Sequence, residues 1–249
     1  MRMILWLSVV VMSTAGLGSV RGADTRARFR MVILRQSWSS MALGYQHEAA
    51  WGKLRVAPLG DALATITSGD IDSYDWQTQA LRLTVEASRQ IVAALPKAAG
   101  REAGAQALMA LEERLGWGNP VERALYTRPF VVLLGDEPMY GGIFLDPPSQ
   151  MGIDYPVARC TIERGHVVFH LLPMQLPFFD VDPGASESAP TSDLVTRNHG
   201  PVSEVPPAML DSFRKLAVSP HARAMRALIQ DPRIREDLLG AGKLTGPKE

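Results

Sequence analysis

The chain has 249 residues, of which 46% are hydrophobic and 21% are charged, as is usual for a globular protein. Its 26 lysine and arginine residues balance 26 aspartate and glutamate residues, so the zero net charge excludes a nucleic-acid binder that relies on broad basic attraction. A single cysteine, Cys160, excludes an intramolecular disulfide and with it the disulfide-framework class of secreted domain.

The first 23 residues have the pattern of a secretory signal peptide. Arg2 precedes an apolar run, Ile4–Met12, and small residues follow as far as Ala23. We expect residues 1–23 to be cleaved off near Ala23, with an uncleaved membrane anchor as the alternative. No later segment has transmembrane length, so the prediction is an exported body, periplasmic or secreted, without membrane insertion beyond the signal segment.

Residues 26–240 are expected to form one α+β domain. The alternation of Arg28–Arg35 predicts a strand, and Thr84 is a suitable N-cap for a helix over Val85–Leu95. A second central helix is predicted over Glu102–Leu115, where leucines recur at helical spacing.

The densest strand pattern predicts two consecutive β-hairpins, at about residues 129–145 and 156–172. The first would be closed by a four-residue turn, Gly135–Pro138, and the second by the two residues Arg164-Gly165. In the second hairpin this turn places Glu163 opposite His166 and turns Cys160 toward the core. We therefore expect an antiparallel sheet of about five to seven strands, covered on one face by the central and C-terminal helices.

The segment 173–206 is rich in proline, serine and acidic residues, which predicts a long irregular loop. Three short helices should follow. The first covers Pro207–Leu216, and the other two begin at Ser219-Pro220 and Asp231-Pro232, where a good N-cap precedes proline. Residues 241–249 are expected to form a frayed tail.

The best candidate for a binding site is a pair of glycines inside the first hairpin, because glycines are unusual within a strand. Gly141 and Gly142 follow Tyr140, and paired glycines in a strand indicate a bulge or a close approach by another backbone or a ligand. If a ligand binds, we expect it where these three residues meet Ser149 and Asp154 of the following loop. The alternative is structural, a bulge followed by a rigid turn.

The histidines do not predict a metal site. His166 and His170 are four residues apart, which on a strand separates them by about 13 Å, too far for one zinc ion. His47, His199 and His221 are expected to be exposed to solvent. The chain also lacks a G-x-S-x-G elbow and a phosphate-binding glycine loop, so no metal and no cofactor is predicted.

These observations favour an exported, non-catalytic protein of the cell envelope that binds a partner protein or a small molecule. The negative results and the long loop motivate this hypothesis, because loops commonly carry recognition. The alternative is a periplasmic or secreted hydrolase, with acid and base groups from Asp154, Glu163 and His166 near the hairpin edges.

Overall fold

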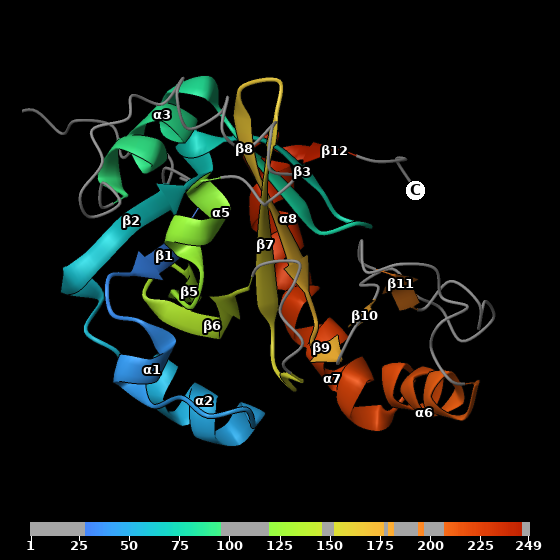
Figure 1. Ribbon diagram of the computed structural model, residues 1–249. Helices are drawn as coiled ribbons and strands as arrows, with labels where there is room; N and C mark the ends of the chain where they lie inside the picture. Colours follow the sequence, from blue (N-terminus) through green and yellow to red (C-terminus); the bar gives the residue numbers. More distant parts are fainter. Residues whose placement is uncertain are drawn as a thin grey trace, which may run out of the picture.

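A computed structural model describes residues 28–95, 120–145, 152–176, 179–181, 194–196 and 207–245, and it has mixed α+β architecture (Figure 1). Within these ranges one sheet has nine strands in the order β12-β3-β4-β8-β7-β6-β5-β1-β2. Its strands are β1 (Phe29–Leu34), β2 (Ala62–Thr67), β3 (Ile71–Asp75), β4 (Ala80–Leu83), β5 (Pro129–Leu134), β6 (Glu137–Phe144), β7 (Val157–Glu163), β8 (His166–Leu172) and β12 (Leu244–Thr245).

Short helices lie between these strands along the chain and beside the sheet (Figure 1). They are α1 (Trp38–Met41), α2 (His47–Leu54), α3 (Val85–Ala94), α5 (Pro120–Leu125), α6 (Pro207–Ala217), α7 (Pro220–Ile229) and α8 (Pro232–Gly240), with 3-10 turns at Leu59–Asp61 and Ser68–Asp70. The expected signal segment, residues 1–23, and the expected helix over Glu102–Leu115 lie outside the described residues.

The predicted helix caps are confirmed. Thr84 Oγ1 accepts a hydrogen bond from the backbone N–H of Ala87 at the start of α3. Ser219 and Asp231 do the same at α7 and α8, each followed by proline at the first helical position. These side chains satisfy N–H groups that have no partner within the helix, which fixes where each helix begins.

The predicted register of the second hairpin is also confirmed. Glu163 pairs with His166 and Cys160 with Phe169, through a turn in which Arg164 has φ of 51° and Gly165 has φ of 83°. Two successive positive φ values match the twist of the flanking strands. Cys160 is 1% exposed, as expected for a core residue.

The four-residue turn predicted for the first hairpin is wrong. Leu134 pairs with Glu137, so Gly135 and Asp136 alone make the turn, with Gly135 at φ of 66°. The register then shifts, because Leu133 pairs with Pro138 and Val132 with Tyr140. Met139 is the extra residue of this bulge, and the bulge lets a proline stand within the strand instead of in the turn.

The sheet is mixed, which corrects the expectation of a purely antiparallel one. Most neighbours are antiparallel, but β6 runs parallel to β7 through Ile143–Phe144, and β12 runs parallel to β3. In Figure 1, β7 and β8 stand upright while β1, β5 and β6 run across the view, so the short parallel contact joins two differently oriented halves of the sheet.

The centre of the sheet is buried on both faces, although the sequence predicted cover on one. Alternate residues of β1 and β5 enter two separate clusters; Met31 and Val132 belong to the first, and Val32 and Val131 to the second. Helices α3, α5 and α8 contribute to the first cluster, whereas α2 contributes to the second. Burial on both sides explains why β5 reads as an unbroken apolar run.

Two segments expected to be irregular contain short strands. Within 173–206, β9 (Gln175–Leu176), β10 (Phe179–Val181) and β11 (Leu194–Thr196) form a three-stranded sheet. Within the expected tail, β12 pairs with β3 because the carbonyl of Lys243 accepts a hydrogen bond from the backbone of Tyr74. Backbone groups in these segments find hydrogen-bond partners in other segments of the chain, and the composition of a segment alone does not predict such pairing.

The helices that the structure describes include none with both the length and the apolar character needed to cross a membrane.

Candidate functional site

The glycine pair serves a close approach between backbones. A Cβ atom on Gly142 would overlap the carbonyl oxygen of Pro156 and would lie 2.6 Å from Cζ of Phe130. One on Gly141 would lie 2.8 Å from the backbone oxygen of Phe130. The absence of a side chain lets β6 approach the Pro156 backbone before β7 at Gly142, and the β5 backbone at Gly141, so packing accounts for both glycines.

Tyr140 is enclosed in the first core cluster and is 1% exposed. Its ring packs edge-on against Phe130, with 6.4 Å between centroids. The hydroxyl has no hydrogen-bond partner, and burial raises the pKa of this phenol above its usual value. The structure therefore places Tyr140 inside the core and away from solvent, and Ser149 of the same predicted site lies outside the described residues.

Asp154 lies instead beside two histidines that the sequence analysis set aside. It belongs to the segment that leads into β7, and its backbone N–H donates to the carbonyl of Tyr45, 3.2 Å away. Nε2 of His221 lies 2.5 Å from the Asp154 carbonyl oxygen and 4.0 Å from its Oδ2. The rings of His221 and His47 are 6.4 Å apart, edge to face. We call these three residues, His47, Asp154 and His221, the His–Asp cluster.

Both histidines lie in the first turn of a helix, which holds them in position. His47 is the first residue of α2, and His221 is the second residue of α7, directly after the Ser219-Pro220 cap. The cluster lies at the surface, since the side chains of His221 and Asp154 are 42% and 40% exposed. Yet Asp154 Oδ1 and His47 Nδ1 are buried atoms without a hydrogen-bond partner.

The environment keeps His47 neutral at physiological pH. Burial lowers the pKa of its imidazole, and the neighbouring His221 lowers it further, whereas the carboxylates of Asp154 and Glu48 raise it by smaller amounts. A neutral imidazole next to a carboxylate can accept a hydrogen bond or a proton from a bound molecule.

Aromatic side chains neighbour the cluster in the chain and are joined to one another. The hydroxyl of Tyr155 donates to the Gly44 carbonyl and accepts from Nε1 of Trp38, both at 3.0 Å. The ring of Trp38 contacts that of Tyr45 at 5.2 Å, and Tyr45 remains 53% exposed. These contacts hold the loop whose Tyr45 carbonyl accepts the hydrogen bond from the Asp154 N–H, and Tyr45 itself remains partly exposed.

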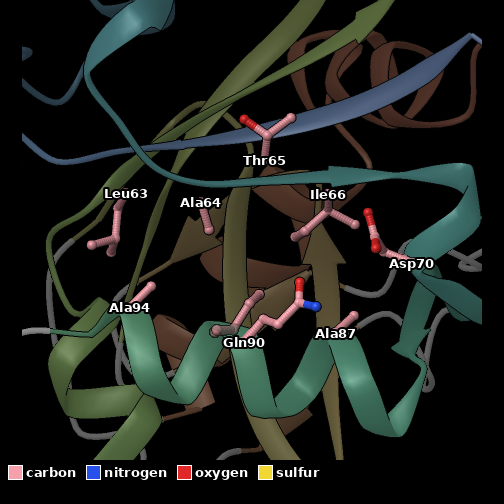
Figure 2. A pocket seen from close by; sticks show the side chains of 9 residues that line it. Leu63, Ala64, Thr65, Ile66, Asp70, Ala87, Gln90 and Ala94 are labelled. Carbon is pink, nitrogen blue, oxygen red and sulfur yellow. The ribbon is translucent and has the colours of Figure 1, made fainter.

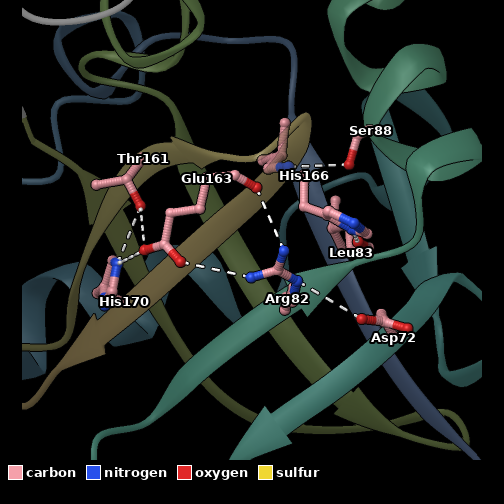
Figure 3. A network of polar contacts seen from close by, with 9 residues as sticks. Asp72, Arg82, Leu83, Ser88, Thr161, Glu163, His166 and His170 are labelled. Atoms are coloured by element: carbon pink, nitrogen blue, oxygen red, sulfur yellow. Dashed lines mark hydrogen bonds and ion pairs between the residues drawn. The ribbon is translucent and has the colours of Figure 1, made fainter.

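The other two acid–base candidates belong to a separate network on the sheet surface (Figure 3). Glu163 accepts from Arg82 of β4 and lies 3.9 Å from His170, while Arg82 also pairs with Asp72 at 3.5 Å. Nδ1 of His166 faces the carbonyl of Leu83 at 2.7 Å, so its ring is engaged by the neighbouring strand. Such cross-strand polar contacts stabilise the pairing of β4, β8 and β7.

The structure does not bring these groups together with Asp154. Asp154 precedes the first residue of β7, and Glu163 is its last residue, six positions beyond Val157. At about 3.3 Å per residue, Val157 and Glu163 at the two ends of β7 are roughly 20 Å apart, and Asp154 lies before the first of them. Asp154, Glu163 and His166 therefore cannot act on one bound substrate at the same time.

A cavity of about 210 Å³ lies between β2 and α3 (Figure 2). Its lining is mainly aliphatic, from Leu63, Ile66 and Ile91, with Asp70 and Gln90 as polar members. The carboxylate of Asp70 is already bound to the backbone and hydroxyl of Thr67. Small-molecule sites usually enclose about 300–1,000 Å³ with convergent polar groups, so this cavity is a weaker candidate than the His–Asp cluster.

Sequence reasoning missed both histidines of the cluster. Their neighbours in the chain gave no metal or catalytic spacing, and only the suitability of Ser219-Pro220 as a helix start hinted that His221 would be held in place. Among the residues that the structure describes, no three His, Cys, Asp or Glu side chains are placed to share a metal ion. Comparison with protein-family models, curated proteins and solved structures gave no match.

Proposed function

We propose that this is an exported, non-catalytic protein of the cell envelope that binds a partner protein or a small molecule through the His–Asp cluster. One observation carries the proposal. Asp154 Oδ1 and His47 Nδ1 have no hydrogen-bond partner, although both atoms are buried. Buried polar atoms are nearly always paired, and leaving one unpaired costs about 1–3 kcal/mol, so a bound group that supplies the missing partner is favoured.

The arrangement around these atoms suits recognition. His47, Asp154 and His221 come from α2, from the segment before β7 and from α7, and the side chains of His221 and Asp154 are partly exposed to solvent. A site built from three separate segments on a rigid sheet holds its groups in fixed positions before the ligand arrives, which lowers the entropy cost of binding.

The proposal assigns the two hairpins, residues 129–145 and 156–172, the role of scaffold, with the central and C-terminal helices as cover. The second hairpin carries Asp154 at its approach, and the packed glycines of the first hold β6 against it. The location in the envelope, periplasmic or secreted, rests on the signal pattern of residues 1–23 alone.

The test is capture of ligands by the mature chain, residues 24–249, from an envelope extract. We expect saturable binding that Asp154→Asn and His221→Gln abolish. The matched control is Asp72→Asn, because Asp72 is also a surface carboxylate, 51% exposed, but pairs with Arg82 away from the cluster. Absence of saturable binding, or equal loss in the Asp72 variant, would refute the proposal.

A hydrolase is the second candidate, and the lowered pKa of His47 favours it. A neutral imidazole near a carboxylate is the usual form of a general base. In that case His47→Gln should abolish hydrolysis of a simple ester such as p-nitrophenyl acetate, while His166→Gln should leave the rate unchanged. Equal rates in both variants and in the parent protein would exclude this candidate.

A further inference from the structure

We propose that the group bound at the His–Asp cluster is a primary ammonium, held by Asp154, His221 and His47 as hydrogen-bond acceptors. The inference rests on the proposed function and names its ligand class. Its basis is the balance of donors and acceptors at the cluster, together with the sign of the surrounding charge.

The hydrogen bond of His221 determines which of its nitrogens can accept. Nε2 lies 2.5 Å from the carbonyl oxygen of Asp154, and a carbonyl can only accept, so Nε2 carries the proton. In the neutral ring, Nδ1 is then an acceptor. Together with the two carboxylate oxygens of Asp154, the cluster offers acceptors and no free charged donor, which matches the three N–H donors of an ammonium group.

The local charge also favours a positively charged ligand. The charged or titratable groups that act on His47 are the carboxylates of Asp154 and Glu48 and the imidazole of His221. The two carboxylates carry two negative charges, and the lowered pKa of His47 leaves its ring uncharged at neutral pH. A cation is attracted to this site, whereas a carboxylate or phosphate is repelled.

An exposed aromatic ring adds a second element of recognition. The carbonyl of Tyr45 accepts from the backbone N–H of Asp154, and 53% of the Tyr45 residue is exposed. The contact with Trp38, at 5.2 Å between centroids, holds this ring. The face of an aromatic ring attracts organic cations.

A metal ion would also bind to oxygen and nitrogen atoms of this kind, but the geometry of the cluster favours an organic cation. Nε2 of His221 is occupied by a backbone carbonyl, and the described residues hold no set of three side chains that could share a metal. An ammonium group needs only hydrogen-bond distances of about 2.7–3.2 Å to its acceptors, with no fixed coordination angle.

Binding should depend on pH in a defined direction. Burial and His221 lower the pKa of His47, so this ring becomes charged only at acidic pH. Protonation of His47 removes its acceptor nitrogen and opposes the negative charge of Asp154. We therefore expect the affinity for an ammonium ligand to fall at least tenfold between about pH 7.5 and about pH 5.

The experiment is NMR titration of the histidine side chains in the mature chain, with n-butylammonium as the probe. Sodium butyrate and n-butanol control for charge, zinc chloride controls for metal binding, and an acetylated and amidated Ala-Lys-Ala peptide presents the same group on a polypeptide. We expect saturable shifts at His47 and His221, none at His166 and His170, and at least a tenfold loss of affinity in Asp154→Asn but not in Asp72→Asn. Tighter binding of the peptide than of n-butylammonium would identify a protein partner as the source of the ammonium group, and the reverse would identify a small amine.

Two outcomes overturn the inference. Shifts with butyrate instead of n-butylammonium would show an anion site, and saturation by zinc without any response to n-butylammonium would show a metal site. Either result leaves the proposed function standing if capture from the envelope extract still depends on Asp154. If capture itself is absent, or is unaffected by Asp154→Asn, the proposed function fails regardless of the ammonium titration.

Discussion

Replacing Gly142 by alanine should strongly destabilise the protein. The added Cβ would lie 2.6 Å and 2.8 Å from two carbons of the Phe130 ring, and it would overlap the Pro156 carbonyl oxygen. That oxygen accepts a hydrogen bond from the backbone N–H of Ile143 at 3.3 Å, which is part of the contact between β6 and β7. The parallel pairing of β6 with β7 spans only Ile143 and Phe144, so there is little to compensate a shift.

Two costs add in this substitution. Forcing an extra methyl group into a packed core costs about 1–3 kcal/mol. Moving Pro156 away from Ile143 costs one more hydrogen bond, about 0.5–1.5 kcal/mol. We expect the free energy of unfolding to fall by about 2–4 kcal/mol, a large share of the roughly 5–15 kcal/mol typical of a folded domain.

Urea denaturation of residues 24–249, followed by circular dichroism, measures this change. The matched control is Gly52→Ala, because Gly52 lies within α2 and an added Cβ there would meet no atom within 4 Å. Alanine is the better helix former, so this control should gain about 0.5–1 kcal/mol. The same substitution would thus act in opposite directions at the two glycines.

A Gly142→Ala variant within about 0.5 kcal/mol of the parent protein would refute this reasoning. Such a result would mean that β6 and β7 can separate at little cost. The glycine pair would then need another explanation, such as a ligand that approaches its backbone.

Further predictions concern the buried thiol and two helix contacts. Burial raises the pKa of Cys160, so we expect no reaction with a thiol reagent at mildly alkaline pH until urea unfolds the chain; rapid labelling of the native protein would contradict this. Hydrogen bonding to Arg233 lowers the pKa of Asp231, so the stability it adds is present above about pH 4 and is lost as the pH falls through its lowered pKa in the folded protein. The Asp231→Asn variant should therefore have a flatter stability profile in acid than the parent, and parallel profiles would contradict the assignment. Asp237 accepts three hydrogen bonds, at 2.8, 2.8 and 2.9 Å, from backbone N–H groups at the start of β1, so Asp237→Asn should cost about 1–3 kcal/mol in urea, and a change below about 0.5 kcal/mol would show that this tie is dispensable.

The local features of the fold could be predicted from the sequence. Thr84, Ser219 and Asp231 begin helices, and the Arg164-Gly165 turn sets the register that pairs Glu163 with His166. These outcomes depend on interactions between residues a few positions apart, such as a cap hydrogen bond or the φ angle of a turn residue. The first hairpin was mispredicted because Pro138 suggested a turn, whereas a bulge at Met139 absorbed it.

Only the tertiary structure decided which side chains meet. His221 contacts Asp154 across 67 positions of sequence, and His47 joins them from a third segment, so no local spacing could reveal the cluster. Packing likewise decided that Gly142 faces Pro156 and that β12 pairs with β3. Periodicity and caps are properties of short stretches, whereas contacts between distant segments depend on how whole elements fill the space around a common core.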